Sequence, residues 1–198
     1  IMVLPVDVNH SSWDHQILSS ADQQQPPIRL GLRLIKGLSE AAGQRIHTAQ
    51  RQRAFANVAD LRQRACLDRG DMEALAAADA LSGISGNRYQ SHWQTMALEA
   101  RRPLLPHDSA AQRSQDDAAV TAAPTLPEDV VADYQSTGLT LRSHPLTLLR
   151  HQPPFDRCRR QTELETLGNH RFVRVAGLVT CRQRPVSYTH LTLPTTLV

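Results

Sequence analysis

Small and apolar side chains recur at helical spacing through most of the first hundred residues. In residues 40–53 they fall on one face of a helix, and Ser39 stands where an N-cap is expected. The same period predicts further helices over residues 58–65, over 71–78, and over a last segment that carries Tyr89, Trp93 and Met96 on its inner face. Residues 78–88 are typical of a turn. About five short helices are therefore expected between Leu34 and Leu98.

Other segments lack this helical period. Residues 3–8 contain strand-forming valines, and Pro5 among them favours an edge strand. Residues 28–34 form a short β-like run, and residues 171–182 alternate apolar and polar side chains as a strand does. Residues 100–128 hold four prolines and no hydrophobic period, which is typical of a flexible linker.

A tight Lys-Gly turn separates an apolar run from a small-residue helix in residues 32–46, LRLIKGLSEAAGQRI. Lys36 in this turn is the single lysine among 22 basic residues. An apolar helix, a glycine-containing hairpin and a second helix make a helix-hairpin-helix element, whose backbone amides can bind a phosphate without reading base sequence. Residues 55–81 repeat the arrangement, so two such elements in tandem are expected.

Basic charge is concentrated around the first hairpin. The net charge of the whole chain is only +3, which is modest for a polyanion-binding protein. Residues 28–56, however, carry six basic side chains against the single acid Glu40, whereas acids outnumber arginines in residues 57–80. The composition, 40% hydrophobic and 21% charged, fits a globular domain with a basic surface at the hairpin.

Cysteines and histidines form no recognisable metal or disulfide pattern. Cys66, Cys158 and Cys181 are widely spaced and odd in number, and we expect Cys66 in the core. The nine histidines show no HxH or HxxxH spacing, and no apolar run reaches the ~18 residues that span a bilayer. We therefore expect no metal site, no membrane contact and a cytoplasmic location.

Adjacent carboxylates occur at Asp116-Asp117 and at Glu128-Asp129, in or beside the linker. Metal-dependent phosphoryl transfer needs carboxylates held in a fixed geometry, which a mobile segment does not provide. We predict that this chain contains no catalytic residue.

Five segments in collinear order resemble the C-terminal part of the bacterial C-family DNA polymerases, which are relatives of the DNA polymerase III alpha subunit. The resemblance is greatest to their error-prone, translesion branch. The segments are PVDVNHSSW, RLGLRLIKGLSEAAGQRI, FANVADLRQRACLDRGDMEALAAADAL, DYQSTGLTLRSHPLTLLR and RFVRVAGLV.

This resemblance implies a mainly α fold in successive parts. These are the end of a polymerase core (1–27), a tandem helix-hairpin-helix domain (28–99), the linker (100–128), a helical connection (129–170) and the first strand of a truncated OB-fold barrel (171–185). Residues 186–198 contain VSYTHLTLPTT, which resembles a translated sequencing-library adapter, so we expect a non-native tail there. The strand-like start at residue 1 likewise suggests that native sequence precedes it.

The resemblance also implies a function. The parent enzyme would extend primers on damaged templates with Mg²⁺ and deoxynucleoside triphosphates, using carboxylates upstream of this chain. The chain itself would need no cofactor and would hold double-stranded DNA. Further implied partners are single-stranded DNA at the OB part, a sliding clamp and a protein resembling a Y-family polymerase. The expected DNA-binding residues are Arg29, Arg33, Lys36, Gly37, Leu38, Ser39, Arg45 and Arg88.

Two positions depart from the family's pattern, and three alternatives stay open. Ser39 and Asp79 stand where the hairpins usually carry glycine, and an acid at Asp79 weakens the second hairpin as a phosphate site. The alternatives are a fragment of the replicative alpha subunit, a non-enzymatic helix-hairpin-helix and OB module, and a helical protein-interaction domain. The last predicts that Lys36→Ala leaves DNA affinity unchanged, whereas the polymerase interpretation predicts a loss.

Overall fold

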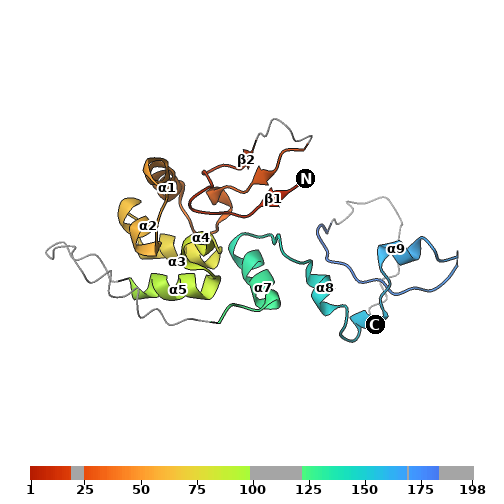
Figure 1. Ribbon diagram of the computed structural model, residues 1–198. Helices are drawn as coiled ribbons and strands as arrows, with labels where there is room; N and C mark the ends of the chain where they lie inside the picture. Colours follow the sequence, from red (N-terminus) through yellow and green to blue (C-terminus); the bar gives the residue numbers. More distant parts are fainter. Residues whose placement is uncertain (19–24, 99–121, 169, 183–198) are drawn as a thin grey trace. The chain divides into compact units, whose positions relative to one another are not determined.

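The computed structural model describes residues 1–18, 25–98, 122–168 and 170–182 (Figure 1). They fall into two compact units, Ile1–Pro145 and Leu146–Val198. The described residues include no helix that is long and apolar enough to cross a bilayer. The expected tail at 186–198 lies outside the described residues.

Three two-residue strands form a small sheet at the start of the first unit. The strands are β1 (Val3–Leu4), β2 (Gln16–Ile17) and β3 (Ile28–Arg29). The central strand, β3, pairs in parallel with β1 and antiparallel with β2. Pro5 directly follows the edge strand β1, which agrees with the edge position predicted from this proline.

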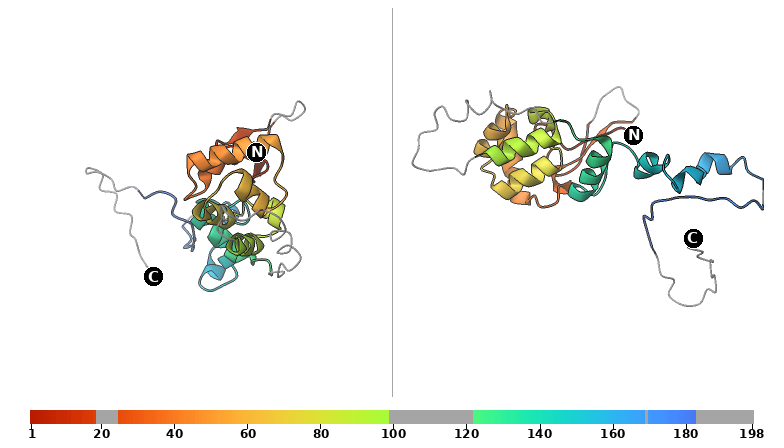
Figure 2. Two further views of the ribbon diagram at one scale, coloured as in Figure 1. Left: turned by 90° about the vertical axis from the view of Figure 1, so that its left-hand side faces the viewer. Right: turned by 90° about the horizontal axis from the view of Figure 1, so that it is seen from below.

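The remainder of this unit is helical, with α1–α5 gathered into one bundle beside the sheet (Figure 2). The sequence of helices is η1 (Leu32–Leu34), α1 (Glu40–Gln52), α2 (Val58–Arg64), α3 (Arg69–Ala77), α4 (Ser82–Ser85), α5 (Arg88–Ala97) and, after residues 99–121, α7 (Leu126–Ser136). The mainly helical fold expected from the sequence is confirmed.

Side-chain caps determine where these helices begin. Ser39, Asn57, Asp68 and Asn87 each accept a hydrogen bond from the backbone amide three residues ahead, which satisfies a donor that the helix itself leaves open. Asp68 also forms a reciprocal capping box with Asp71, and this box starts α3 two residues earlier than the hydrophobic pattern alone indicates.

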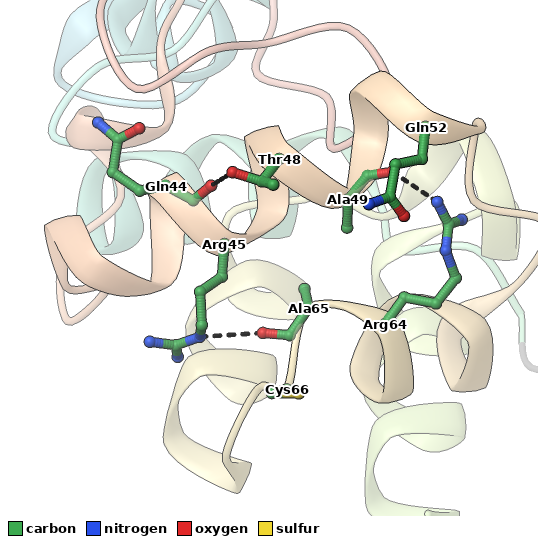
Figure 3. Close-up of a pocket in the computed structure, with 8 residues that line it drawn as sticks. All are labelled: Gln44, Arg45, Thr48, Ala49, Gln52, Arg64, Ala65 and Cys66. Carbon is green, nitrogen blue, oxygen red and sulfur yellow. Dashed lines mark hydrogen bonds between the residues drawn. The ribbon is translucent and has the colours of Figure 1, made fainter.

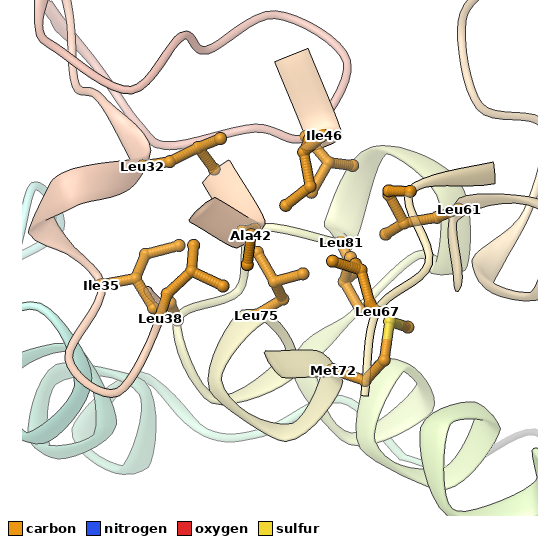
Figure 4. Close-up of a cluster of buried hydrophobic side chains, with 14 of the residues drawn as sticks. Leu32, Ile35, Leu38, Ala42, Ile46, Leu61, Leu67, Met72, Leu75 and Leu81 are labelled. Atoms are coloured by element: carbon orange, nitrogen blue, oxygen red, sulfur yellow. The ribbon is translucent and has the colours of Figure 1, made fainter. Parts of the chain in front are cut away.

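One apolar cluster holds the bundle and the sheet segment together (Figure 4). Its largest fully buried side chains are Leu32, Ile46, Leu61, Met72, Leu75, Leu81 and Val8. Gly43 on α1 leaves room for Trp13, because a Cβ at this position would lie 2.3 Å from a carbon of the indole ring. The core therefore depends on residues from the N-terminal segment as well as from the helices.

The N-terminal segment is tied to the helices by hydrogen bonds. The Asn9 side chain accepts from the Phe55 amide at 2.7 Å and donates to the Phe55 carbonyl at 3.1 Å. The Val8 amide donates to the Ala80 carbonyl at 3.1 Å. The boundary expected at residue 27 therefore does not separate two packing units, since residues 1–27 share a unit with the helices.

The face of α5 that turns inward differs from the prediction. Tyr89, Trp93 and Met96 are 41, 53 and 51% exposed, whereas Arg88, Ser91 and Thr95 are buried. The expectation that the aromatic side chains of this helix fill the core is wrong. Polar bonds decide the orientation instead, because Arg88 is paired with carboxylates on α7.

The end of the expected linker is also corrected. Residues 99–121 lie outside the described residues, but α7 already begins at Leu126, before the boundary placed at 128. Thr125 and Glu128 form a capping box at this point, and Pro127 occupies the first turn, where a proline costs no hydrogen bond.

The second unit contains the short helices α8 (Pro145–Leu149), η2 (Phe155–Arg157) and α9 (Gln161–Leu164). Residues 171–182, expected to be the first strand of an OB barrel, are not in a strand in the structure. A barrel strand gains its hydrogen bonds from neighbouring strands, and the described residues of this unit contain none. The OB barrel therefore stays a prediction.

Candidate nucleic-acid interface

The first hairpin links η1 to α1 through residues 35–39. Ile35 and Leu38 are buried in the core, and between them Gly37 has φ +88°, in the left-handed region that glycine adopts at little cost. The apolar anchors hold the turn in place while Lys36, Gly37 and Ser39 are exposed. Leu38, predicted to contact DNA, is buried and therefore supplies packing that anchors the hairpin.

The amino end of α1 presents unpaired backbone amides. The Ser39 hydroxyl accepts from the Ala42 amide at 3.2 Å, and the Leu38 amide is bonded to the Ile35 carbonyl. Within the part of the chain that the structure describes, no acceptor is recorded for four amides, those of Gly37, Ser39, Glu40 and Ala41. All four residues are exposed. Oriented amides at a helix start favour an anion, although the Glu40 carboxylate beside them opposes it.

Lys36 is held by the carboxyl end of α7. Its ammonium group donates to the carbonyl oxygens of Tyr134 and Gln135, at 3.0 and 2.9 Å. Its backbone amide donates to the Ser136 carbonyl at 2.9 Å. Of the predicted phosphate-binding groups of this hairpin, the Lys36 amide and side chain are therefore already engaged within the protein.

Three predicted arginines lie on or near the surface, each with a partner. Arg33 pairs with Asp14 at 2.7 Å while 58% of its side chain stays exposed. Arg29 donates to the Pro5 carbonyl at 3.3 Å. Arg45 donates to the Ala65 carbonyl at 3.0 Å and pairs with Asp71 at 3.3 Å. The Arg33–Asp14 pair is exposed and therefore weak, so this guanidinium group remains able to turn toward a phosphate. The partner of Arg45, Asp71, is buried, so Arg45 is held more firmly.

Arg88 requires a correction as a predicted DNA contact. Its side chain is 7% exposed and pairs with Asp129 at 2.5 Å and with Asp133. A guanidinium group that is buried between two carboxylates is not accessible to a phosphate. Arg88 instead fastens α5 to α7.

The second hairpin is a poorer anion site than the first. Asp79 has φ +57°, so the turn does require the left-handed conformation that was expected to strain this position. The amides of Asp79, Ala80 and Ser82 are all bonded within the protein. One Asp79 carboxylate oxygen pairs with Arg142 at 2.6 Å, and the other is buried with no hydrogen-bond partner among the described residues.

Arg142 is a residue that the sequence reasoning missed. It lies in the loop after α7 and reaches Asp79 on one side and Asp129 and Asp133 on the other. Burial raises the pKa of Asp79, and the guanidinium groups of Arg88 and Arg142 oppose that shift. The only signal in the sequence was the spacing of the two α7 aspartates, which puts both on one helix face.

A shallow groove of about 290 Å³ runs between α1 and α2 (Figure 3). Arg45 and Arg64 reach across it, and Arg64 donates to the carbonyls of Ala49 and Arg53 at the carboxyl end of α1. Cys66 lines the groove and is exposed, with φ +49°, so the expectation of a core thiol is wrong. The turn after α2 directs this side chain outward.

The adjacent carboxylates have structural roles where they are described. Hydrogen bonds from the Thr125 amide and hydroxyl lower the pKa of Glu128, which caps α7. Asp129 pairs with Arg88, and Asp116-Asp117 lies outside the described residues. Across the described ranges, no group of three or more His, Cys, Asp or Glu residues is placed to hold a metal ion.

The amino-acid sequence is similar to a helix-hairpin-helix family and to known DNA polymerases. The family model described as a helix-hairpin-helix motif matches residues 1–91. Error-prone DNA polymerases are similar over nearly the whole chain: that of Teredinibacter turnerae is 46% identical over 187 residues, that of Saccharophagus degradans 45% over 188, and that of Xanthomonas oryzae 45% over 194. These matches cover 93 to 94% of this chain and 18% of each relative. The chain thus spans less than a fifth of the length of these relatives.

Proposed function

We propose that this chain, whose sequence matches a segment of the error-prone DNA polymerases along nearly all its length, is the part of such an enzyme that holds duplex DNA by its backbone. The observation that carries the proposal is the set of four unpaired amides at the first hairpin and the start of α1. Amides of this kind bind phosphate oxygens irrespective of the bases, which suits a polymerase that must hold any sequence.

The contact would be asymmetric between the two hairpins. The first hairpin offers the amides of Gly37, Ser39, Glu40 and Ala41, while Leu38 keeps the turn anchored in the core. Arg29, Arg33 and Arg45 would add charge to neighbouring phosphates along the strand. The second hairpin contributes less, because the amides of Asp79, Ala80 and Ser82 are bonded within the protein and Asp79 repels a phosphate.

The remaining activity would belong to the whole enzyme. Primer extension on damaged templates would use Mg²⁺ and nucleotides at carboxylates in the rest of the polymerase, and this chain alone would catalyse nothing. A sliding clamp, a partner resembling a Y-family polymerase and single-stranded DNA at an OB part remain proposed partners, and the cytoplasm is the proposed location. Among the alternatives, the similarity to error-prone DNA polymerases favours the error-prone branch over the replicative alpha subunit.

Binding of labelled duplexes to the full chain tests this function. Fluorescence anisotropy with two duplexes of unrelated sequence should give equal affinities that fall as salt rises. A duplex should bind more tightly than either of its single strands. Absence of any duplex binding at low salt would contradict the proposal and favour a protein-interaction domain.

A further inference from the structure

The carboxyl end of α7 meets the first hairpin where a phosphate is proposed to bind. The Thr137 and Gly138 amides both bond to the Asp133 carbonyl, so this capping leaves the last carbonyls of α7 open. Those of Tyr134, Gln135 and Ser136 are taken up by Lys36, through its ammonium group and its amide. A helix carboxyl end carries roughly half a negative elementary charge. The α7 carbonyl oxygens therefore attract the Lys36 ammonium group as the oxygens of a phosphate would.

We propose that α7 competes with the DNA backbone for Lys36, so that α7 in its docked position lowers the affinity of the first hairpin for DNA. The inference rests on the proposed function, since it concerns the same hairpin. Displacement of α7 frees one amide and the only lysine of the chain for a phosphate.

A buried charge network keeps α7 in place. Arg88 of α5 pairs with Asp129 and Asp133 on α7, and Arg142 joins the same two carboxylates to Asp79 of the second hairpin. On the inner face Val130 is buried, whereas Val131 on the outer face is 55% exposed. One helix held by charge pairs and a single deeply buried valine can be displaced without opening the main core.

The neighbouring amides permit a stepwise exchange. Gly37, Ser39, Glu40 and Ala41 are exposed while α7 is docked, so a phosphate can arrive before α7 leaves. Once bound, the phosphate offers Lys36 a full negative charge in place of the partial charge on the α7 carbonyls. Bound DNA is therefore expected to loosen α7.

A charge-neutral substitution on the exposed face of α7 separates competition from simple electrostatics. Val131→Pro removes a helix hydrogen bond and clashes with the preceding turn, and Val131→Ala is the matched control that keeps the helix. Lys36→Ala is then made in both backgrounds, and duplex affinity is measured for the full-length chain. We expect Val131→Pro to tighten duplex binding about fivefold. Lys36→Ala should weaken duplex binding at most about twofold in the Val131→Ala background and about fivefold in the Val131→Pro background.

Hydrogen exchange of the unmodified chain provides a second measurement that does not rely on a folded proline variant. Amides of residues 130–136 should exchange faster when duplex DNA is bound. Equal or slower exchange with DNA, or an equal cost of Lys36→Ala in both backgrounds, would overturn the competition while leaving duplex binding intact. Failure of every variant to bind duplex would instead contradict the proposed function itself.

Discussion

The Glu40 amide can be removed without disturbing the rest of the first hairpin. Glu40 is the first residue of α1, a position where proline is well tolerated because the amide has no partner within the helix. Ser39 before it has φ −77° and ψ 152°, the extended conformation that a residue preceding proline adopts. Glu40→Pro therefore deletes one donor from the proposed phosphate site and keeps the fold.

The matched control is Glu40→Ala, because both variants lose the same carboxylate. Loss of this charge should tighten DNA binding about twofold, given ~0.5 kcal/mol between unit charges several ångströms apart in water. The proline variant should additionally lose a charge-assisted hydrogen bond, worth ~1.5 kcal/mol, which is about a tenfold weakening relative to Glu40→Ala. Duplex affinity by fluorescence anisotropy at constant low salt measures the difference.

A second proline and alanine pair shows whether the effect belongs to the hairpin. Arg69 is the first residue of α3, exposed and capped by Asp68, so its amide is comparable but lies outside the first hairpin. Arg69→Pro and Arg69→Ala should bind duplex equally. Equal binding by the two Glu40 variants, with thermal stability unchanged, would refute the claim that hairpin amides hold the phosphate.

Three further predictions concern stability, measured by urea unfolding. Arg88→Met should destabilise the chain by about 3 kcal/mol, since it leaves the carboxylates of buried Asp129 and of Asp133 with Arg142 as their one remaining guanidinium partner among the described residues. Asp79→Gly should stabilise the chain by about 1 kcal/mol, because glycine adopts the positive φ at little cost. Burial penalises the ionised form of Asp79 and raises its pKa, so the stability of the wild type should fall as pH rises through that pKa. This fall should be smaller in the Asp79→Gly variant. Leu75→Ala should cost about 3 kcal/mol, whereas exposed Trp93→Ala should change stability by less than about 0.5 kcal/mol.

Local signals in the sequence predicted α1 and α2 well but missed α4, because residues 78–88 were expected to form a turn and Ser82–Ser85 are helical. The Ser39 cap and the spacing of small residues predicted α1, and the apolar spacing predicted α2, each to within one residue of its ends. A capping side chain bonds an amide about three residues ahead, and the apolar positions of a helix recur every three or four residues. Both signals can therefore be recognised within a short stretch of sequence. The Lys-Gly turn was predictable for the same reason, whereas the positive φ at Asp79 was expected from the glycine that the resembled family carries at that position.

Contacts between distant segments account for most of the errors. Arg88 was taken for a DNA contact because nothing near it in the sequence shows the pairing with Asp129, 41 residues later. That ion pair also turns α5, so that its aromatic side chains face outward. The engagement of Lys36 with α7 spans 98 residues and was equally invisible in the local pattern.

Amide exchange at the first hairpin tests the central claim most directly. Exchange rates of Gly37, Ser39, Glu40 and Ala41 are compared in the free chain and with saturating duplex DNA of arbitrary sequence. The account predicts that these four amides exchange more slowly when duplex is bound, because they then donate hydrogen bonds to phosphate oxygens. Unchanged exchange at all four, under conditions where anisotropy shows the duplex to be bound, would contradict it.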